Sequence, residues 1–127
     1  MIEDTQKIIL IVDDDPLFAR MYERLLLKEG YVVHVARNGN EGLESMRSKR
    51  PDLVLLDLLM PQLNGLEMLK AAKRDPELAA LPIIIFTSLS AEKDRKESLA
   101  AGAADYFIKE SSATKPLLKR IKELLQL

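Results

Sequence analysis

The chain has 127 residues, of which 47% are hydrophobic and 31% are charged, a balance typical of one soluble globular domain. It contains no cysteine and a single histidine, which excludes disulfides, thiol nucleophiles, iron–sulfur clusters and multi-histidine metal sites. Its 19 basic and 20 acidic residues give a net charge of −1, so the total charge carries no signature of direct nucleic-acid binding.

The segment before the first apolar run, residues 1–7, is acidic, and the run itself has only five residues. A secretory signal peptide has a basic start and a longer apolar core. No other stretch approaches the roughly 18 apolar residues of a membrane-spanning helix. We therefore expect a cytoplasmic protein without a membrane partner.

The first half of the chain alternates apolar runs with amphipathic segments. Ile8–Val12 is a continuous apolar run rich in β-branched residues, which is typical of a strand buried on both faces. Pro16 then suits a first helical turn, and apolar residues recur at helical spacing until Gly30 ends the helix. Tyr31–Val35 predicts a strand at a sheet edge, and Asn40–Lys49 predicts a weaker helix.

The second half continues this alternation. Leu53–Leu56 and Ile83–Phe86 are continuous apolar runs, so they predict two further buried strands. Asn64–Arg74, between them, predicts a helix. Ala91–Ala101 is mostly polar, with Leu99 as its main apolar anchor, and it predicts a loosely held helix.

The C-terminal part adds a last strand and a last helix. Tyr106–Ile108 predicts the second edge strand. A stripe of apolar residues from Leu117 to Leu125 predicts the helix that follows, and Thr114 can cap it. Five strand–helix units in this order predict an α/β fold, with a five-stranded parallel sheet covered by helices on both faces. We expect one domain spanning residues 1–127.

Side chains able to do chemistry follow the predicted strands at their carboxyl ends. Asp13–Asp15 follow the first strand, Asp57 follows the third, Thr87 the fourth and Lys109 the fifth. Ligands of open parallel sheets bind at these ends. We therefore expect the carboxylates, the hydroxyl and the ammonium group to share one rim.

Clustered carboxylates repel, since two unit charges about 4 Å apart cost roughly 4 kcal/mol at an effective dielectric constant of 20. Lys109 supplies one counter-charge, and a hard divalent cation can supply two more. Magnesium takes oxygen ligands and leaves positions open for phosphate oxygens. A carboxylate beside such an ion can act as a nucleophile, so the combination favours phosphoryl transfer.

Five separate motifs resemble the receiver domain of response regulators in two-component signal transduction, the superfamily that includes the chemotaxis regulators. They are Val12-Asp13-Asp14-Asp15-Pro16, Leu55-Leu56-Asp57-Leu58-Leu59-Met60-Pro61, Asn64-Gly65, Phe86-Thr87-Ser88, and Ala101-Gly102-Ala103-Ala104-Asp105-Tyr106 with Lys109. The resemblance covers about Lys7 to Leu127. It implies a doubly wound, flavodoxin-like (βα)5 fold with the sheet order 2-1-3-4-5.

The resemblance also implies a role for each residue of the rim. Asp57 would accept the phosphoryl group. Asp13 and Asp14, together with Asp57 and the backbone carbonyl of Leu59, would hold Mg²⁺ as the cofactor. Lys109 would pair with Asp57 and afterwards with the phosphoryl group.

Two further pairs of residues follow from the same resemblance. The Thr87 hydroxyl would bond a phosphoryl oxygen, and Tyr106 would swing inward when Thr87 is drawn toward the site. Leu59 and Leu89 would flank the path of the water that hydrolyses the phosphorylated residue. Leucine cannot orient a water molecule by hydrogen bonding, so we expect slow hydrolysis.

The sequence departs from the family after Lys109, where the family usually has a proline with a cis bond and this chain has Glu110. A non-proline cis bond costs roughly 2.5–4 kcal/mol. The Lys109–Glu110 bond is therefore expected to be trans or strained.

No output domain is apparent in the sequence, so we expect a stand-alone receiver or a receiver excised from a longer protein. The resemblance implies that it is not an enzyme beyond phosphoryl transfer to itself and autodephosphorylation. Its phosphoryl group would come from a sensor histidine kinase or a histidine phosphotransfer protein. Phosphorylation would then change the surface of the fourth helix, fifth strand and fifth helix, which binds an unknown output protein. The chain would be a monomer or a phosphorylation-dependent dimer.

Two alternatives belong to other classes. A haloacid-dehalogenase-like phosphatase would use Asp13 as nucleophile and Asp15 as acid–base, but the chain is short and shows neither a cap insertion nor a second acidic pair. A flavodoxin-like flavin binder needs a phosphate-binding loop after the first strand. An Asp-Asp-Asp loop would instead repel phosphate.

Overall fold

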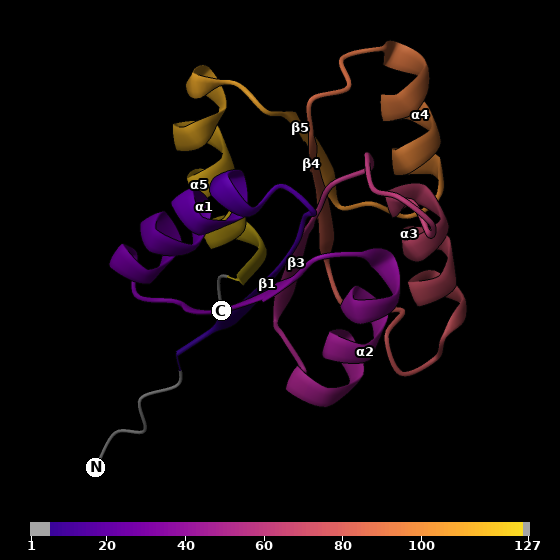
Figure 1. Ribbon diagram of the computed structural model, residues 1–127, viewed down its shortest axis with the longest axis horizontal. Coiled ribbons are helices and arrows are strands. Elements are labelled where there is room, and N and C mark those ends of the chain that lie inside the picture. The colour runs from indigo at the N-terminus through magenta and orange to yellow at the C-terminus, as the bar shows by residue number, and fades with distance from the viewer. Residues whose placement is uncertain (1–5, 126–127) are drawn as a thin grey trace.

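The computed structural model describes residues 6–125, in which five strands alternate with five α-helices (Figure 1). Residues 1–5 lie outside this range, and they belong to the acidic segment from which we predict that there is no signal peptide. The elements are β1 (Ile8–Val12), α1 (Pro16–Lys28), β2 (Val32–Ala36), α2 (Gly39–Lys49), β3 (Leu53–Leu56), α3 (Gly65–Arg74), β4 (Ile83–Thr87), α4 (Glu92–Ala100), β5 (Asp105–Ile108), a 3-10 turn (Ser111–Ala113) and α5 (Thr114–Leu125).

The strands form one parallel sheet in the order β2-β1-β3-β4-β5. This confirms the predicted fold class and strand order, with β2 and β5 at the edges. The interior position of β1 is fixed by its pairing on both sides, where Ile9 lies opposite Val33 of β2 and Leu53 of β3. No helix within residues 6–125 is long and apolar enough to cross a lipid bilayer.

The two faces of the sheet carry separate hydrophobic clusters, because successive strand residues point to opposite sides. Ile9 and Ile11 of β1 pack with buried residues of α1 and α5, whereas Leu10 and Val12 pack with buried residues of α2 and α3. Figure 1 shows this arrangement, with α1 and α5 on one side of the sheet and α2, α3 and α4 on the other.

Two predictions about the helices are wrong. The buried residue of α4 is Ser98, whereas Leu99 is only half-buried and joins neither hydrophobic cluster. Adjacent helical residues point about 100° apart, and it is the face carrying Ser98 that meets the rest of the fold. Thr114 does not precede the last helix but begins it after Ser111–Ala113, and its hydroxyl is hydrogen bonded to Tyr22 at 2.8 Å.

Other helix ends agree closely with the sequence. Pro16 is the first residue of α1, and Asn64 caps α3 through a capping box with Glu67.

Every described peptide bond is trans, including the one between Lys109 and Glu110, which settles the choice that the sequence left open.

Candidate functional site

The predicted site residues lie at or directly after the carboxyl ends of β1, β3, β4 and β5. These strands run upward in Figure 1, so their carboxyl ends share one edge of the sheet. The backbones of the site residues are tied to neighbouring strands. The Asp13 N–H donates to the Ala36 carbonyl at 3.0 Å, and the Asp57 N–H donates to the Val12 carbonyl at 3.0 Å. The Lys109 N–H donates to the Thr87 carbonyl at 2.7 Å. The ladder of the sheet therefore positions residues that are up to 96 positions apart in the chain.

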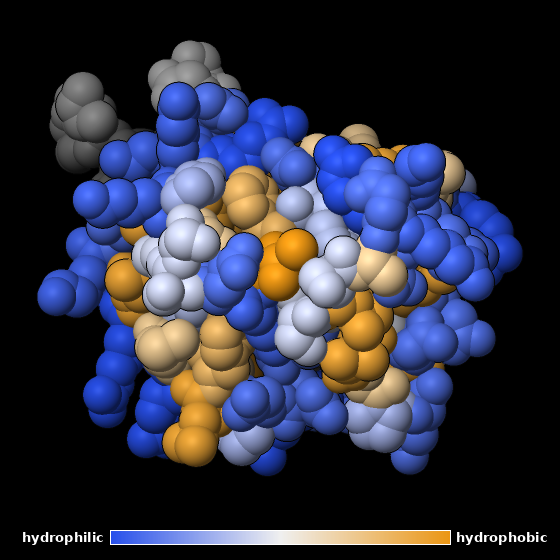
Figure 2. All heavy atoms as spheres, turned by 90° about the horizontal axis from the view of Figure 1, so that it is seen from above, coloured by the Kyte–Doolittle hydropathy of each residue, from blue (hydrophilic) through white to orange (hydrophobic). Residues whose placement is uncertain are grey.

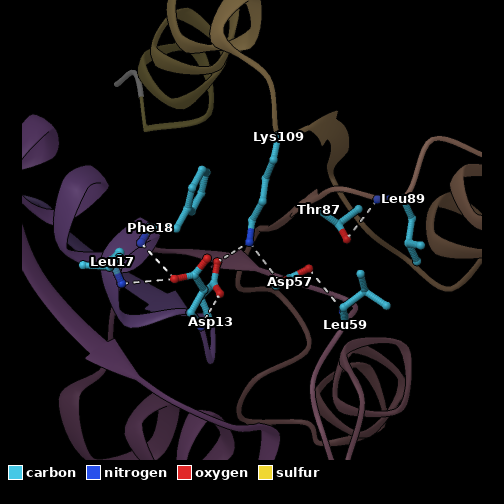
Figure 3. A network of polar contacts seen from close by, with 9 residues as sticks. Asp13, Leu17, Phe18, Asp57, Leu59, Thr87, Leu89 and Lys109 are labelled. Carbon is cyan, nitrogen blue, oxygen red and sulfur yellow. Dashed lines mark hydrogen bonds and ion pairs between the residues drawn. The ribbon is translucent and has the colours of Figure 1, made fainter.

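The centre of the site is a lysine between two buried carboxylates. Lys109 Nζ lies 2.7 Å from Asp13 Oδ2 and 3.0 Å from Asp57 Oδ2. Figure 3 shows the lysine side chain reaching down between the two aspartates. Both aspartates are 4% exposed, so water screens these charges poorly.

The second oxygen of each buried carboxylate accepts a backbone hydrogen bond. Asp13 Oδ1 accepts from the Asp15 N–H at 2.9 Å, and Asp57 Oδ1 accepts from the Leu59 N–H at 3.1 Å. These bonds hold both carboxylates in fixed orientations without neutralising them.

Burial and pairing act against each other on the ionisation of this cluster. Burial raises the pKa of Asp13 above its ordinary value, although Lys109 and the Asp15 N–H act to lower it. Burial alone would lower the pKa of Lys109, but its hydrogen bonds to Asp13 and Asp57 outweigh burial and raise that pKa. Lys109 is therefore a permanent cation at neutral pH, and the site holds more carboxylate than it can neutralise.

An aromatic ring completes the surroundings of Lys109. Its Nζ lies 4.2 Å from the centroid of the Phe18 ring, a cation–π distance. Phe18 is itself held by Tyr22 and Phe86, with ring centroids 4.9 and 5.3 Å away. The sequence pattern indicates Phe18 only as an apolar residue of the helix that follows the acidic loop, and it does not reveal this contact with Lys109.

The acidic residues divide their roles between the fold and the site. Asp15 caps α1 by accepting from the Leu17 and Phe18 N–H groups at 3.1 and 3.3 Å. Asp14 is exposed and is not the cap of α1. Carboxylate oxygens of Asp13, Asp14 and Asp57 all lie within 4.8 Å of one another.

This donor set fits a hard divalent cation. Oxygen ligands are what Mg²⁺ and Ca²⁺ prefer, and an exposed third carboxylate leaves the cluster open to solvent and phosphate oxygens. Three carboxylates share a single ammonium group here, so a cation would remove repulsion that the protein leaves uncompensated.

The start of α3 packs directly beneath Asp57. A Cβ atom on Gly65 would lie 2.2 Å from the Asp57 carbonyl oxygen and 2.6 Å from the Leu58 Cα. Only glycine permits this approach. In the sequence, Asn64-Gly65 is recognisable only as a family motif, and the close approach that requires glycine becomes visible in the structure.

Thr87, Leu89 and Tyr106 form a second group beside Asp57. Thr87 is fully buried, and its hydroxyl accepts a long hydrogen bond of 3.5 Å from the Leu89 N–H. The Tyr106 hydroxyl donates to the Leu89 carbonyl at 2.8 Å, and its ring is already buried. Burial, and then the negative charges of Asp94 and Asp57, raise the pKa of Tyr106.

The two leucines predicted to flank the water path line one pocket of about 290 Å³, next to Asp57. Leu59 is 48% exposed, and Leu89 is half-buried. Figure 3 places both on the side of Asp57 that faces away from Asp13.

Comparisons with known proteins point to one family. Residues 9–122 match the family described as response regulator receiver domain. The chain is 38% identical to protein PilH of Pseudomonas aeruginosa over 117 residues, covering 92% of this chain and 96% of PilH. It is 36% identical to the probable transcriptional regulatory protein TcrX of Mycobacterium tuberculosis, covering 93% of this chain but only 49% of TcrX.

The fold is similar to solved receiver domains. The BeF3-activated N-terminal receiver domain of Klebsiella pneumoniae RstA superposes with a TM-score of 0.87 and 30% identity, over 94% of this chain and 99% of that one.

Proposed function

The chain belongs to the response regulator receiver domain family, and from this membership we propose that it accepts a phosphoryl group on Asp57 in a Mg²⁺-dependent reaction. The observation that carries the proposal is the pairing of one lysine with two buried carboxylates at the carboxyl ends of β1 and β3. Such an uncompensated acidic cluster is costly for stability, and a divalent cation bound there would offset the repulsion and attract the oxygens of a phosphoryl group.

In the proposed reaction a carboxylate oxygen of Asp57 attacks the phosphorus atom of the donor. The new P–O bond forms as the bond from phosphorus to the donor's leaving atom breaks, and the leaving group keeps that electron pair. The Leu59 N–H holds the Asp57 carboxylate in one orientation. Lys109, which now pairs with that carboxylate, would pair with the phosphoryl oxygens after the transfer.

Magnesium, when bound, would neutralise charge on the phosphoryl oxygens. Asp13, Asp14 and Asp57 would hold it, with the Leu59 carbonyl as a further ligand. Asp13 is the buried anchor of this set, and Asp14 is its solvent-facing member.

Thr87 and Tyr106 are proposed to report the phosphoryl group to the surface of α4, β5 and α5. Thr87 is bonded only weakly, through the Leu89 N–H at 3.5 Å, so its hydroxyl can turn to a phosphoryl oxygen. Tyr106 holds the carbonyl of the same Leu89. A movement of Thr87 would therefore be transmitted to Tyr106 through one shared residue.

Leu59 and Leu89 are proposed to make the phosphorylated state long-lived, because neither side chain can orient an attacking water. Replacing Leu59 with Asn and Leu89 with Glu should accelerate loss of the phosphoryl group, measured by intact mass. Equal rates in the double variant and the parent would contradict this role.

The proposed donor is a sensor histidine kinase or a histidine phosphotransfer protein, and the proposed output is protein binding. The match to PilH covers 96% of that protein, which supports one receiver domain over residues 1–127. The phosphatase alternative loses its acid–base group, because Asp15 is occupied as the cap of α1. A cytoplasmic location and the monomer–dimer choice stay predictions.

The decisive experiment incubates the protein with Mg²⁺ and a small phosphodonor and follows the intact mass. We expect one phosphoryl group on the parent, none on Asp57→Asn, and none on the parent when the metal is chelated. Stable phosphorylation of Asp57→Asn, or continuous release of phosphate without a phosphorylated protein, would refute the proposal.

A further inference from the structure

The pocket beside Leu59 and Leu89 has chemistry that phosphoryl acceptance does not use. Its apolar wall comes from the β3–α3 loop, the start of α3 and the β4–α4 loop. Its polar wall comes from one face of α4, where Asp94, Glu97 and Ser98 stand at helical spacing.

Ser98 is the residue of the pocket that most strongly indicates a ligand. It is fully buried, and its hydroxyl makes no hydrogen bond within residues 6–125. A buried polar group without a partner is costly, and native proteins rarely keep one without a reason. Ser98 is also the only residue of α4 that is fully buried, so this helix meets the fold through a hydroxyl where an apolar side chain would be expected.

The charged groups of the pocket are all negative. Asp94 and Glu97 line it, and neither forms an ion pair with any residue of the described part of the chain, whereas Glu92 on the same helix pairs with Arg95. The pocket therefore offers two carboxylates and a hydroxyl, all able to accept hydrogen bonds, above a wall of leucines and a methionine. The amide of Asn64 also lines the pocket, but its oxygen already accepts from the Glu67 N–H at 2.9 Å.

Size and surroundings narrow the ligand further. About 290 Å³ lies at the lower limit of small-molecule sites and suits one long side chain better than a nucleotide. Leu59 extends apolar surface beyond the mouth, since it is 48% exposed. Figure 2, which looks down on this end of the molecule, shows apolar side chains in small groups among hydrophilic ones.

We propose that this pocket binds an arginine or lysine side chain of a partner polypeptide. The aliphatic part of that side chain would lie against the leucines, its cationic end would pair with Asp94 and Glu97, and one N–H would donate to Ser98 Oγ. An apolar residue next to the basic one in the partner would contact Leu59.

The test uses blocked dipeptides and nuclear magnetic resonance of the unphosphorylated chain in saturating Mg²⁺, which occupies the cluster around Asp57. We expect N-acetyl-Arg-Leu-amide to shift the amide signals of Leu59, Leu89 and residues 94–99 saturably. N-acetyl-Gln-Leu-amide, which lacks the cation, should bind at least tenfold more weakly. Equal binding of the two probes, or shifts confined to Asp13 and Asp14, would overturn the proposal.

Two sets of variants separate a ligand site from a merely structural role. Asp94→Asn with Glu97→Gln should abolish the preference for the arginine probe. The matched pair Glu44→Gln with Glu77→Gln, which removes the same charge from exposed positions elsewhere, should keep it. Loss of the preference in both double variants would show a general charge effect and overturn the proposal.

Ser98→Ala should change the stability of the protein and its affinity for the arginine probe in opposite directions. Removing an unpartnered buried hydroxyl should raise the melting temperature, while the loss of one charge-assisted hydrogen bond should weaken the arginine probe roughly tenfold. Unchanged affinity would refute the role of Ser98. Butylguanidine, which carries the cationic group of arginine without a peptide backbone, is the last probe. If it binds as tightly as the arginine dipeptide, the ligand is a free organic cation and the proposal of a polypeptide partner is overturned. None of these outcomes depends on phosphorylation of Asp57.

Discussion

Replacing Lys109 with Met should destabilise the metal-free protein strongly. The variant keeps a long apolar stem but leaves the Asp13 and Asp57 carboxylates without a counter-charge. Two unit charges at 4.8 Å, the outer limit of their separation, repel by about 3.5 kcal/mol at an effective dielectric constant of 20. Breaking a buried ion pair by removing one partner costs about 3–5 kcal/mol, which agrees with that value.

This free energy converts into a large change of melting temperature. At about 2.1 cal/mol/K for each residue, a chain of this length has an unfolding entropy of about 0.27 kcal/mol/K. The melting temperature of Lys109→Met should therefore fall by about 11–19 °C in the presence of a chelator. Circular dichroism or scanning calorimetry measures it directly.

Controls show whether charge, and not packing, is responsible. Lys119→Met, an exposed lysine of α5, should change the stability by less than about 0.5 kcal/mol. Adding Mg²⁺, or adding Asp57→Asn to Lys109→Met, should restore much of the loss because either change removes uncompensated negative charge. A loss below about 1 kcal/mol, or one that neither change reverses, would refute the electrostatic reasoning.

Three more predictions concern the same rim. Burial raises the pKa of Asp13 above the ordinary aspartate value of 3.8, so the contribution of this group to stability is fully present below pH 3.8 and is lost as the pH rises through the raised pKa. Asp13→Asn should therefore melt at a higher temperature than the parent at neutral pH without metal, and this difference in melting temperature should vanish near pH 3.8. In the parent, millimolar Mg²⁺ should raise the melting temperature, and Asp14→Ala should lose that rise together with phosphorylation. Thr87→Ala should still be phosphorylated, yet hydrogen exchange across residues 87–109 should no longer respond to it; an unchanged response would remove Thr87 from the switch.

Much of the fold was readable from local sequence. The apolar runs at Ile8–Val12, Leu53–Leu56 and Ile83–Phe86 identified three buried strands, because a strand buried on both faces needs apolar residues at every position. The order of the strands came from family resemblance, since periodicity alone does not say which strands are neighbours. The wrong predictions were the buried face of α4, at Leu99, and the start of α5, at Thr114. Both depend on what the helix packs against.

The sequence by itself determined which groups gather at the rim, because parallel strands bring their carboxyl ends to one edge and Asp13, Asp57, Thr87 and Lys109 stand at those ends. Only the tertiary structure decided how they pair. That Lys109 bridges two aspartates and lies against Phe18, and that Ser98 is buried without a partner, depend on distances between elements far apart in the chain. Such distances follow from how whole helices pack on the sheet, and the local pattern of residues does not encode them.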